Sequence, residues 1–355
     1  MEILVSLIVL AICFIYLACI VDNYFLKSLD NIADWLKLSP SVAGATLMAI
    51  GTSAPELSTA MFALFLPNTN PATGLGTIVG SALFQILVVI GFASLVKTSY
   101  LNWKPVVRDG VFYTFSIIAL VLVLLDGNIS VVEGGIFLSL YVLYLLVLIL
   151  WTKYVKESDP DPIELFEEGL EEESKGSPVA AVIDLMTFPL RLLPDPSKKE
   201  RATIPVFILS LVGIAGISYV LVISAETLAS GLGVPAAIIA LTILAGGTSV
   251  PELISSAIVA KQGRGDMAIS NAIGSNIFDI LISLGLPVFI YTLINGDLAA
   301  TDTENINTSI LLLFATMIMV LLLLASQRFK AGRLFGLILC GLYVVYVIAA
   351  YAGLL

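Results

Sequence analysis

The stretch Gly51-Thr-Ser-Ala-Pro-Glu-Leu57 recurs almost unchanged as Gly247-Thr-Ser-Val-Pro-Glu-Leu253, and both copies lie inside long apolar stretches. Each copy places one glutamate, Glu56 or Glu252, where a membrane would surround it. A carboxyl group in that position is costly and is a functional-site hypothesis by default. Two such acids in a repeated motif predict one shared cation site between two related halves.

The composition is that of a membrane protein. Hydrophobic residues make up 59% of the 355 positions and charged residues only 12%, which excludes a soluble domain. Many apolar runs reach the ~20 residues that a helix needs to cross a bilayer. We predict an all-α membrane protein with ten transmembrane helices, at residues 2–21, 39–66, 72–96, 109–126, 131–152, 203–225, 234–260, 266–293, 307–326 and 334–353.

The basic residues predict the orientation. All 17 Lys and Arg residues fall in alternate connections between these spans, and the connection after the fifth span holds those from Lys153 to Arg201. Positively charged loops stay in the cytoplasm, so both the N and the C terminus are expected outside. The first span has Glu2 and no basic residue ahead of it, so we expect it to be retained and not cleaved as a signal peptide.

Two halves of opposite orientation follow from the repeat. Each half holds five expected spans, and an odd number makes the second half enter from the other side, as in many secondary transporters. We expect a first transmembrane repeat at 1–152, an acidic cytoplasmic loop at 153–202 and an inverted second repeat at 203–355. Nine acids between Glu157 and Glu173 indicate a solvated linker. A regulatory calcium-binding segment is the alternative, but no regular ligand spacing supports it.

The motif residues suit a dehydrated cation. Pro55 and Pro251 each remove a helix hydrogen bond, so nearby backbone carbonyls, at Ala49 to Thr52 and Ala245 to Thr248, need other partners. Hydroxyl and amide groups recur at helical spacing around the acids. Oxygen ligands of this kind fit calcium, and no soft ligand accompanies them that would favour zinc or copper. The candidate ion ligands are Glu56, Glu252, Thr52, Thr248, Ser53, Ser249, Asp279, Ser81, Ser275, Gln85, Ala49 and Ala245.

Other polar residues are assigned simpler roles. Glu226 lies near the outer end of its expected helix, where an interfacial or capping acid is typical. The three cysteines, Cys13, Cys19 and Cys340, lie in apolar spans and are expected to form no disulfide. The chain has no His, so histidine-based proton relays and metal sites are absent.

The repeat motifs resemble a known family. The segments from Gly44 to Leu57 and from Ala245 to Leu253 resemble the two alpha repeats of the calcium/cation antiporter superfamily. Within it, Gly76-Thr-Ile-Val-Gly-Ser81 and the segment from Gly265 to Leu281 most resemble the potassium-dependent sodium/calcium exchangers.

The resemblance implies a role for each matching residue. Glu56 and Glu252 would be calcium ligands, Thr52 and Thr248 would supply backbone oxygen, and Asp279 would bear on potassium. Sodium would be served by the hydroxyls of Ser53, Ser249, Ser81 and Ser275. Asp also occurs at this position in potassium-independent prokaryotic relatives, so potassium use stays open. The family usually has Asn where this chain has Gln85, which faces Asp279 by the symmetry of the repeat and extends the amide by one methylene.

The preferred function is a secondary active antiporter that exchanges sodium for calcium by alternating access, with potassium co-transport left open. Glu56, Glu252 and Asp279 sum to −3, which matches one calcium plus one potassium, or three sodium ions. A calcium/proton antiporter is the alternative, since the same acids could carry protons. A cation channel is the alternative from another class, although channels favour symmetric rings around a pore. An intramembrane protease is less supported because there is no intramembrane Lys to activate a Ser.

The expected setting is the plasma membrane. The partners are the lipid bilayer and the transported ions Ca2+, Na+ and, if co-transported, K+; no nucleic acid, no resident cofactor and no enzymatic activity are expected, and a monomer is left open. The second, third, seventh and eighth spans, which hold the candidate ligands, should form a core. The first and sixth spans carry no acid in mid-membrane and should slide against that core.

The topology can be tested by labelling. A Cys introduced at Asn70 or Asn128 should react from outside with a thiol reagent that does not cross membranes, because both sites lie in connections without basic residues. A Cys introduced at Ser174, in the acidic loop, should react only after the cells are opened. Labelling of Ser174→Cys in intact cells would contradict the orientation.

Overall fold

The structure is a computed structural model that describes residues 2–36, 49–67, 69–125, 127–154, 187–192, 194, 196, 200–261, 263, 265–299 and 304–354. Its helical elements are α1 (Glu2–Ile20), η1 (Val21–Phe25), α2 (Leu26–Leu36), α4 (Ala49–Thr52), α5 (Ala54–Phe65), α6 (Pro71–Phe84), η3 (Gln85–Val89), α7 (Ile90–Val96), α8 (Trp103–Leu124), α9 (Val131–Tyr154), η4 (Phe188–Leu192), η5 (Glu200–Ala202), α12 (Thr203–Leu232), α13 (Ala236–Ile239), η6 (Ala240–Leu244), α14 (Ala245–Thr248), α15 (Val250–Lys261), α16 (Gly265–Phe278), η7 (Asp279–Leu284), α17 (Gly285–Asn295), α18 (Glu304–Ser326) and α19 (Arg333–Tyr351).

Eight described helices are long and apolar enough to cross a membrane. A bent pair, Ala236–Thr248 with Val250–Lys261, adds a ninth if it is counted as one span. These nine correspond to nine of the expected spans. The expected span at 39–66 lies partly outside the described residues, and its described part forms α4 and α5. Most of the expected loop at 153–202 also lies outside them. The chain is therefore a multi-pass, all-helical membrane protein.

The first helix is longer than expected. It continues without a break through the π-helical turn η1 to Leu36, and not only to residue 21. Asp22 consequently lies inside the helix, where it is only 6% exposed and its Oδ1 atom has no hydrogen-bond partner. The expectation of no acid in mid-membrane covers residues 2–21, and Asp22 lies one residue beyond that range. Hydropathy alone ends the span at the first charged residue, although burial against a neighbouring helix lets it continue.

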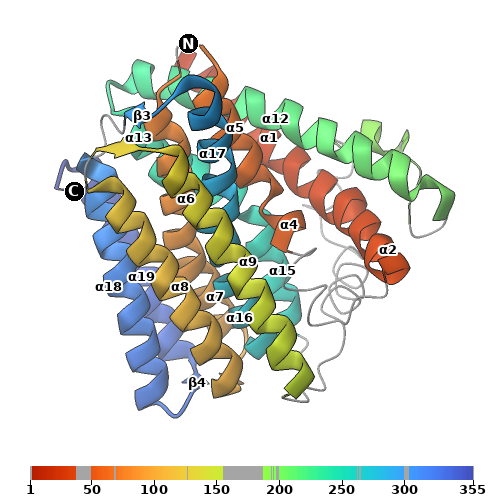
Figure 1. Ribbon diagram of the computed structural model, residues 1–355, viewed down its shortest axis with the longest axis vertical. Helices are drawn as coiled ribbons and strands as arrows, with labels where there is room; N and C mark the ends of the chain where they lie inside the picture. Colours follow the sequence, from red (N-terminus) through yellow and green to blue (C-terminus); the bar gives the residue numbers. More distant parts are fainter. Residues whose placement is uncertain are drawn as a thin grey trace.

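Two long helices form one flank of the molecule. The helix α1–η1–α2 packs along α12, and Figure 1 shows this pair in red and green, running side by side. The other helices stand beside the pair as a bundle, with α8, α18 and α19 farthest from it in this view. Both chain ends lie toward the end of the molecule that carries β3, while β4 lies at the opposite end (Figure 1).

Two short strand pairs join the first half of the chain to the second. Strand β1 (Ser99–Tyr100) pairs with β4 (Lys330–Ala331), and β2 (Asn128–Ile129) pairs with β3 (Leu298–Ala299), both antiparallel. β1 and β3 follow the third and the eighth expected spans, whereas β2 and β4 follow the fourth and the ninth. β1 in the first half therefore corresponds to β3 in the second, and β2 corresponds to β4. The pair β1–β4 is thus the symmetry equivalent of the pair β3–β2.

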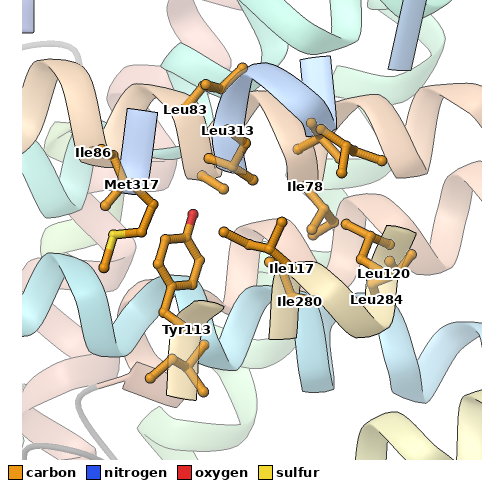
Figure 2. Packing of buried hydrophobic residues seen from close by; sticks show 14 of the residues in the cluster. Ile78, Leu83, Ile86, Tyr113, Ile117, Leu120, Ile280, Leu284, Leu313 and Met317 are labelled. Carbon is orange, nitrogen blue, oxygen red and sulfur yellow. The ribbon is translucent and has the colours of Figure 1, made fainter. Parts of the chain in front are cut away.

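A dry apolar core supports the helices that carry the candidate ligands. Figure 2 shows Ile86 and Ile280, the residues that directly follow Gln85 and Asp279, packed together with side chains of α8 and α18. Tyr113 of α8 is fully buried in this cluster, and its hydroxyl has no hydrogen-bond partner. The core thus fixes η3 and η7 against an apolar wall made by α8 and α18.

Helix α6 approaches η6 so closely that only glycine fits at the contact. A Cβ atom built on Gly80 would lie 2.3 Å from the carbonyl oxygen of Leu241 and 2.7 Å from the Cβ atom of Ala245. Small residues at such positions let helix backbones meet inside a membrane, where packing and not the hydrophobic effect holds helices together. This contact sets Ser81, the next residue, against the second motif.

Substitution at Gly80 should therefore loosen the protein. Gly80→Ala forces the backbone of η6 to move, and overpacking of this kind costs about 1–3 kcal/mol. We expect a clearly lower melting temperature in detergent. Gly216→Ala is the matched control, because no atom lies within 4 Å of a Cβ atom built on Gly216 of α12. Equal melting temperatures for the two variants would contradict the close contact.

Candidate cation site

Both motif copies interrupt their helices at the same position. Ser53 separates α4 from α5 with φ −91° and ψ 5°, and Ser249 separates α14 from α15 with φ −87° and ψ 13°. These angles lie in the bridge region and not in the helical region. The helices on the two sides of Ser249 bend by 44°. The repeated sequence therefore folds into two matching breaks.

The prolines explain which carbonyls lack helical partners. Pro55 and Pro251 have no N–H group, so they cannot donate to the carbonyls of Gly51 and Gly247 one turn earlier. The carbonyls of Ala49 and Ala245, in contrast, accept backbone hydrogen bonds from Ser53 at 3.0 Å and from Ser249 at 3.2 Å. Each of these two carbonyls keeps one lone pair for another partner.

Glu56 joins three elements from the two halves. Its Oε1 atom accepts hydrogen bonds from Ser81 of α6 at 2.8 Å and from Ser249 at 3.1 Å. The two serine hydroxyls also contact each other. The Oε2 atom of Glu56 is buried without a hydrogen-bond partner. The first motif and the second motif thus meet at one carboxylate.

The equivalent acid of the second half is less satisfied. Ser275 of α16 hydrogen-bonds to Ser53 at 3.0 Å and lies 3.4 Å from the Thr52 hydroxyl. Glu252 is fully buried, and neither of its carboxylate oxygens has a hydrogen-bond partner among the described residues. It lies within electrostatic range of Glu56 and Asp279. Three ionised acids so placed would repel one another, and either a bound cation or a proton relieves that repulsion.

Asp279 and Gln85 contact each other, as the repeat symmetry predicts. The Nε2 atom of Gln85 donates to Oδ2 of Asp279 at 3.1 Å, and Ser283 donates to Oδ1 at 3.3 Å. Each of the two contacting residues begins a π-helical turn, η3 or η7. Such turns occur frequently at functional sites. The Oε1 atom of Gln85 remains buried without a partner.

All predicted site residues are buried, with exposures of 2% or less. Several of their oxygens lack a donor: Oε2 of Glu56, both carboxylate oxygens of Glu252 and Oε1 of Gln85. The Oδ1 atom of Asn276, next to Ser275, is a further one. Buried polar atoms are normally paired, and an excess of acceptors without donors is the situation that a bound cation resolves.

The acids are spread along the site and not clustered. The described part of the chain contains no group of three or more Asp, Glu, His or Cys side chains placed to hold one metal ion. Hydroxyl, amide and carbonyl oxygens must therefore complete any coordination shell. Such mixed oxygen shells are typical of calcium and other hard cations.

Sequence reasoning missed three side chains near the site. Asn276 directs its amide toward the carbonyl of Ala82, at 3.5 Å, and leaves its oxygen free. Ser283 supports Asp279 from within η7, and the buried Tyr113 lies within electrostatic range of the same acid. Asn276 and Ser283 are polar residues in an apolar span, one residue after Ser275 and four after Asp279, and that spacing could have indicated them.

Comparison with known proteins identifies the family. The family model described as "Sodium/calcium exchanger protein" matches residues 6–150 and 203–352. The chain is 30% identical to the human sodium/potassium/calcium exchanger 5, over 88% of this chain and 77% of the relative. It is 28% identical to the chicken (Gallus gallus) sodium/potassium/calcium exchanger 2, over 95% of this chain and 75% of the relative.

A solved structure shares the fold. The sodium-calcium exchanger NCX_Mj, soaked with sodium and strontium, superposes with a TM-score of 0.60 at 25% sequence identity. The alignment covers 98% of this chain and 99% of that one. The same exchanger soaked with zero sodium and calcium gives a TM-score of 0.57. The two blocks of the family model, the curated relatives and the shared fold together show that this chain is a member of the sodium/calcium exchanger family.

Proposed function

We propose that this protein exchanges sodium for calcium across a membrane, with Glu56 and Glu252 as the shared calcium ligands. The observation that carries the proposal is the set of buried oxygens without donors where the two motif breaks meet. A cation that binds there would replace its water shell with carboxylate, hydroxyl and carbonyl oxygens. The relatives named sodium/potassium/calcium exchangers support the same ions.

The full ligand set extends across both halves. We assign calcium to the carboxylates of Glu56 and Glu252, with one backbone oxygen from each motif turn: Thr52 and Thr248, or Ala49 and Ala245. The hydroxyls of Ser53, Ser249, Ser81 and Ser275 would bind sodium once calcium has left. Asp279 and Gln85, which lie beside this group, would hold a further monovalent ion.

The architecture that we assign is a pair of inverted repeats, at 1–152 and 203–355, joined by the cytoplasmic loop at 153–202. Strand pairs that interchange with the halves support it, as do the matching breaks at Ser53 and Ser249. Ten spans would place both termini on one side, and the segregated basic residues put that side outside. We assign the protein to the plasma membrane and leave a monomer as its simplest working form.

Counter-transport explains the arrangement better than the alternatives do. An antiporter needs one site that either ion species can neutralise, and three acids match one calcium plus one potassium, or three sodium ions. A pore lined by rings of identical groups is the usual design of a channel, whereas this site is formed by two different halves. A calcium/proton antiporter would use the same acids, and sodium dependence distinguishes it.

The motion that we assign moves the long helix pair against the rest. The helix α1–η1–α2 packs mainly on α12, and the ligands lie on α5, α6, α15, α16 and the turns beside them. Apolar contacts allow sliding because they have no preferred direction. Movement of the pair would open the site to one side of the membrane at a time.

Each motif glutamate should be indispensable for calcium. Glu56→Gln and Glu252→Gln each remove one charge that compensates for calcium dehydration, so we expect the calcium affinity to fall about 100-fold, equal to ~2.7 kcal/mol. The measurement is calcium-45 uptake into proteoliposomes under a sodium gradient. Glu133→Gln is the matched control, because Glu133 caps α9 by accepting from Ser130. Near-normal affinity in either motif variant would refute the site.

Asp279 should determine the use of potassium. The same uptake is measured at graded potassium in the parent, in Asp279→Asn and in Ser283→Ala. If potassium binds at Asp279, the Asn variant should still exchange sodium for calcium but lose its stimulation by potassium, since one charge is gone. Ser283→Ala removes a hydrogen bond and no charge, so its stimulation should persist. Identical potassium curves for the parent and Asp279→Asn would refute the assignment.

Gln85 offers a complementary measurement. Gln85→Asn restores the amide that is usual in the family and shortens the side chain that donates to Asp279. We expect it to change the affinity for sodium or potassium more than the affinity for calcium. No uptake driven by sodium in the parent protein, under any potassium concentration, would overturn the exchange function itself.

A further inference from the structure

Glu226 links a helix of the sliding pair to a helix of the site. It lies on α12, and its Oε1 atom accepts a hydrogen bond from the backbone N–H of Asn70 at 3.3 Å. The same atom accepts from the hydroxyl of Thr73. Asn70 and Thr73 form the start of α6, so the carboxylate caps α6 from another helix. Of the two expected roles, interfacial or capping, these contacts agree with capping, although the helix that is capped is α6 and not α12.

The position at the start of α6 suits a negative charge. The first N–H groups of a helix have no partner inside the helix, and the helix dipole is positive there. The Asn70 side chain satisfies one of these groups, the N–H of Ala72, at 2.9 Å. Glu226 adds a charged acceptor that α6 cannot supply itself, because Pro71 and Ala72 begin the helix.

Apolar contacts between α12 and its neighbours accompany this link. Tyr219 of α12 meets Phe62 of α5 edge-on, with ring centroids 5.7 Å apart. Leu228 and Ala229 belong to the apolar cluster that α12 shares with α1. Apolar contacts tolerate displacement, whereas hydrogen bonds to a carboxylate hold one position. Glu226 therefore defines a register between α12 and α6.

Helix α6 connects the Glu226 contact to the candidate ion ligands. Thr73 and Ser81 are eight residues apart on one continuous helix, which is roughly 12 Å. Gly80 holds the far end of α6 against η6, and Ser81 donates to Glu56. If α12 moves relative to the start of α6, helix α6 therefore links that movement to Ser81 and Glu56 at its other end.

We propose that Glu226 is a positioning residue that latches the outer end of α12 to α6 and stabilises the conformation closed to the outside. The proposal rests on the exchange function and on the orientation proposed above. Opening to the outside would require α12 to leave the start of α6 and to break both hydrogen bonds. The latch therefore sets the balance between the two access states and does not bind an ion.

The test measures the calcium concentration that gives half-maximal exchange on each face, in right-side-out and inside-out proteoliposomes. Glu226→Ala should lower the outer value and raise the inner value, each by about fivefold, because it favours the outward-open state. Glu226→Gln should give smaller shifts in the same directions, since its oxygen still accepts without charge. Thr227→Ala is the matched control, because the Thr227 hydroxyl bonds to the carbonyl of Ile223 in its own helix.

Thr73→Val removes the donor on the other side of the latch. If both residues act through one interaction, Thr73→Val should shift both values in the same directions as Glu226→Ala but by less, because the Asn70 N–H still donates to Glu226. The double variant should shift them no further than Glu226→Ala alone. Additive effects, unchanged values, or shifts in one direction on both faces would overturn the proposal. A residue needed only for folding would reduce turnover on both faces without opposite shifts.

A distance measurement separates the latch from transport. Spin labels at Leu232→Cys on α12 and Leu293→Cys on α17, with the three native cysteines replaced, report the separation of the outer helix ends. Both positions are exposed, at 44% and 66%. We expect Glu226→Ala to move the population toward longer distances, even if the proteoliposomes show no sodium-driven exchange. An unchanged distance distribution would overturn the latch and leave the exchange function untouched.

Discussion

Buried oxygen atoms without hydrogen-bond donors are the constraint on which this structure depends. In water such atoms cost little, but inside a bilayer each must meet a donor or a positive charge. Glu252 has neither among the described residues, and Glu56 is half satisfied by two serines from opposite halves. The fold brings these oxygen atoms together because each motif helix breaks at the equivalent serine, Ser53 in the first motif and Ser249 in the second. A bound cation or a proton on the carboxyl groups would remove this deficit, so we expect the conformation to depend on ion occupancy.

Close packing of the helix backbones holds the buried oxygen atoms without donors in place. Gly80 lets α6 touch η6, and the apolar wall of α8 and α18 fixes η3 and η7 from behind. These contacts hold oxygens of like charge near each other although they repel. The long pair α1–η1–α2 and α12 meets the helices that carry the candidate ligands through apolar contacts and through the Glu226 carboxylate.

The repeated motif was sufficient to predict that these residues lie together, and the reason is chemical. An acid beside a proline in an apolar run has few structural explanations, and its recurrence leaves fewer. The contact between Gln85 and Asp279 followed from the same symmetry. Asn276 and Ser283 were missed because one polar residue in a span does not reveal which way it points. Asp22 was missed because hydropathy cannot show that a helix continues where a neighbour buries its charge. The π-helical turns leave no periodic signal, since each shifts the register by a single residue.

The strand pairs carry a consequence for how such proteins evolve. β1–β4 and β2–β3 join the two halves at opposite ends of the molecule, and the helices of the halves interleave between them. The two strand pairs therefore join the halves in addition to the loop that links them in sequence. The alignment with the chicken relative runs over 492 positions, longer than this chain, and the family model omits residues 151–202. A segment inserted into this connection would leave both strand pairs and the helices that carry the candidate ligands as they are, so a relative can grow longer here without altering the candidate ion site.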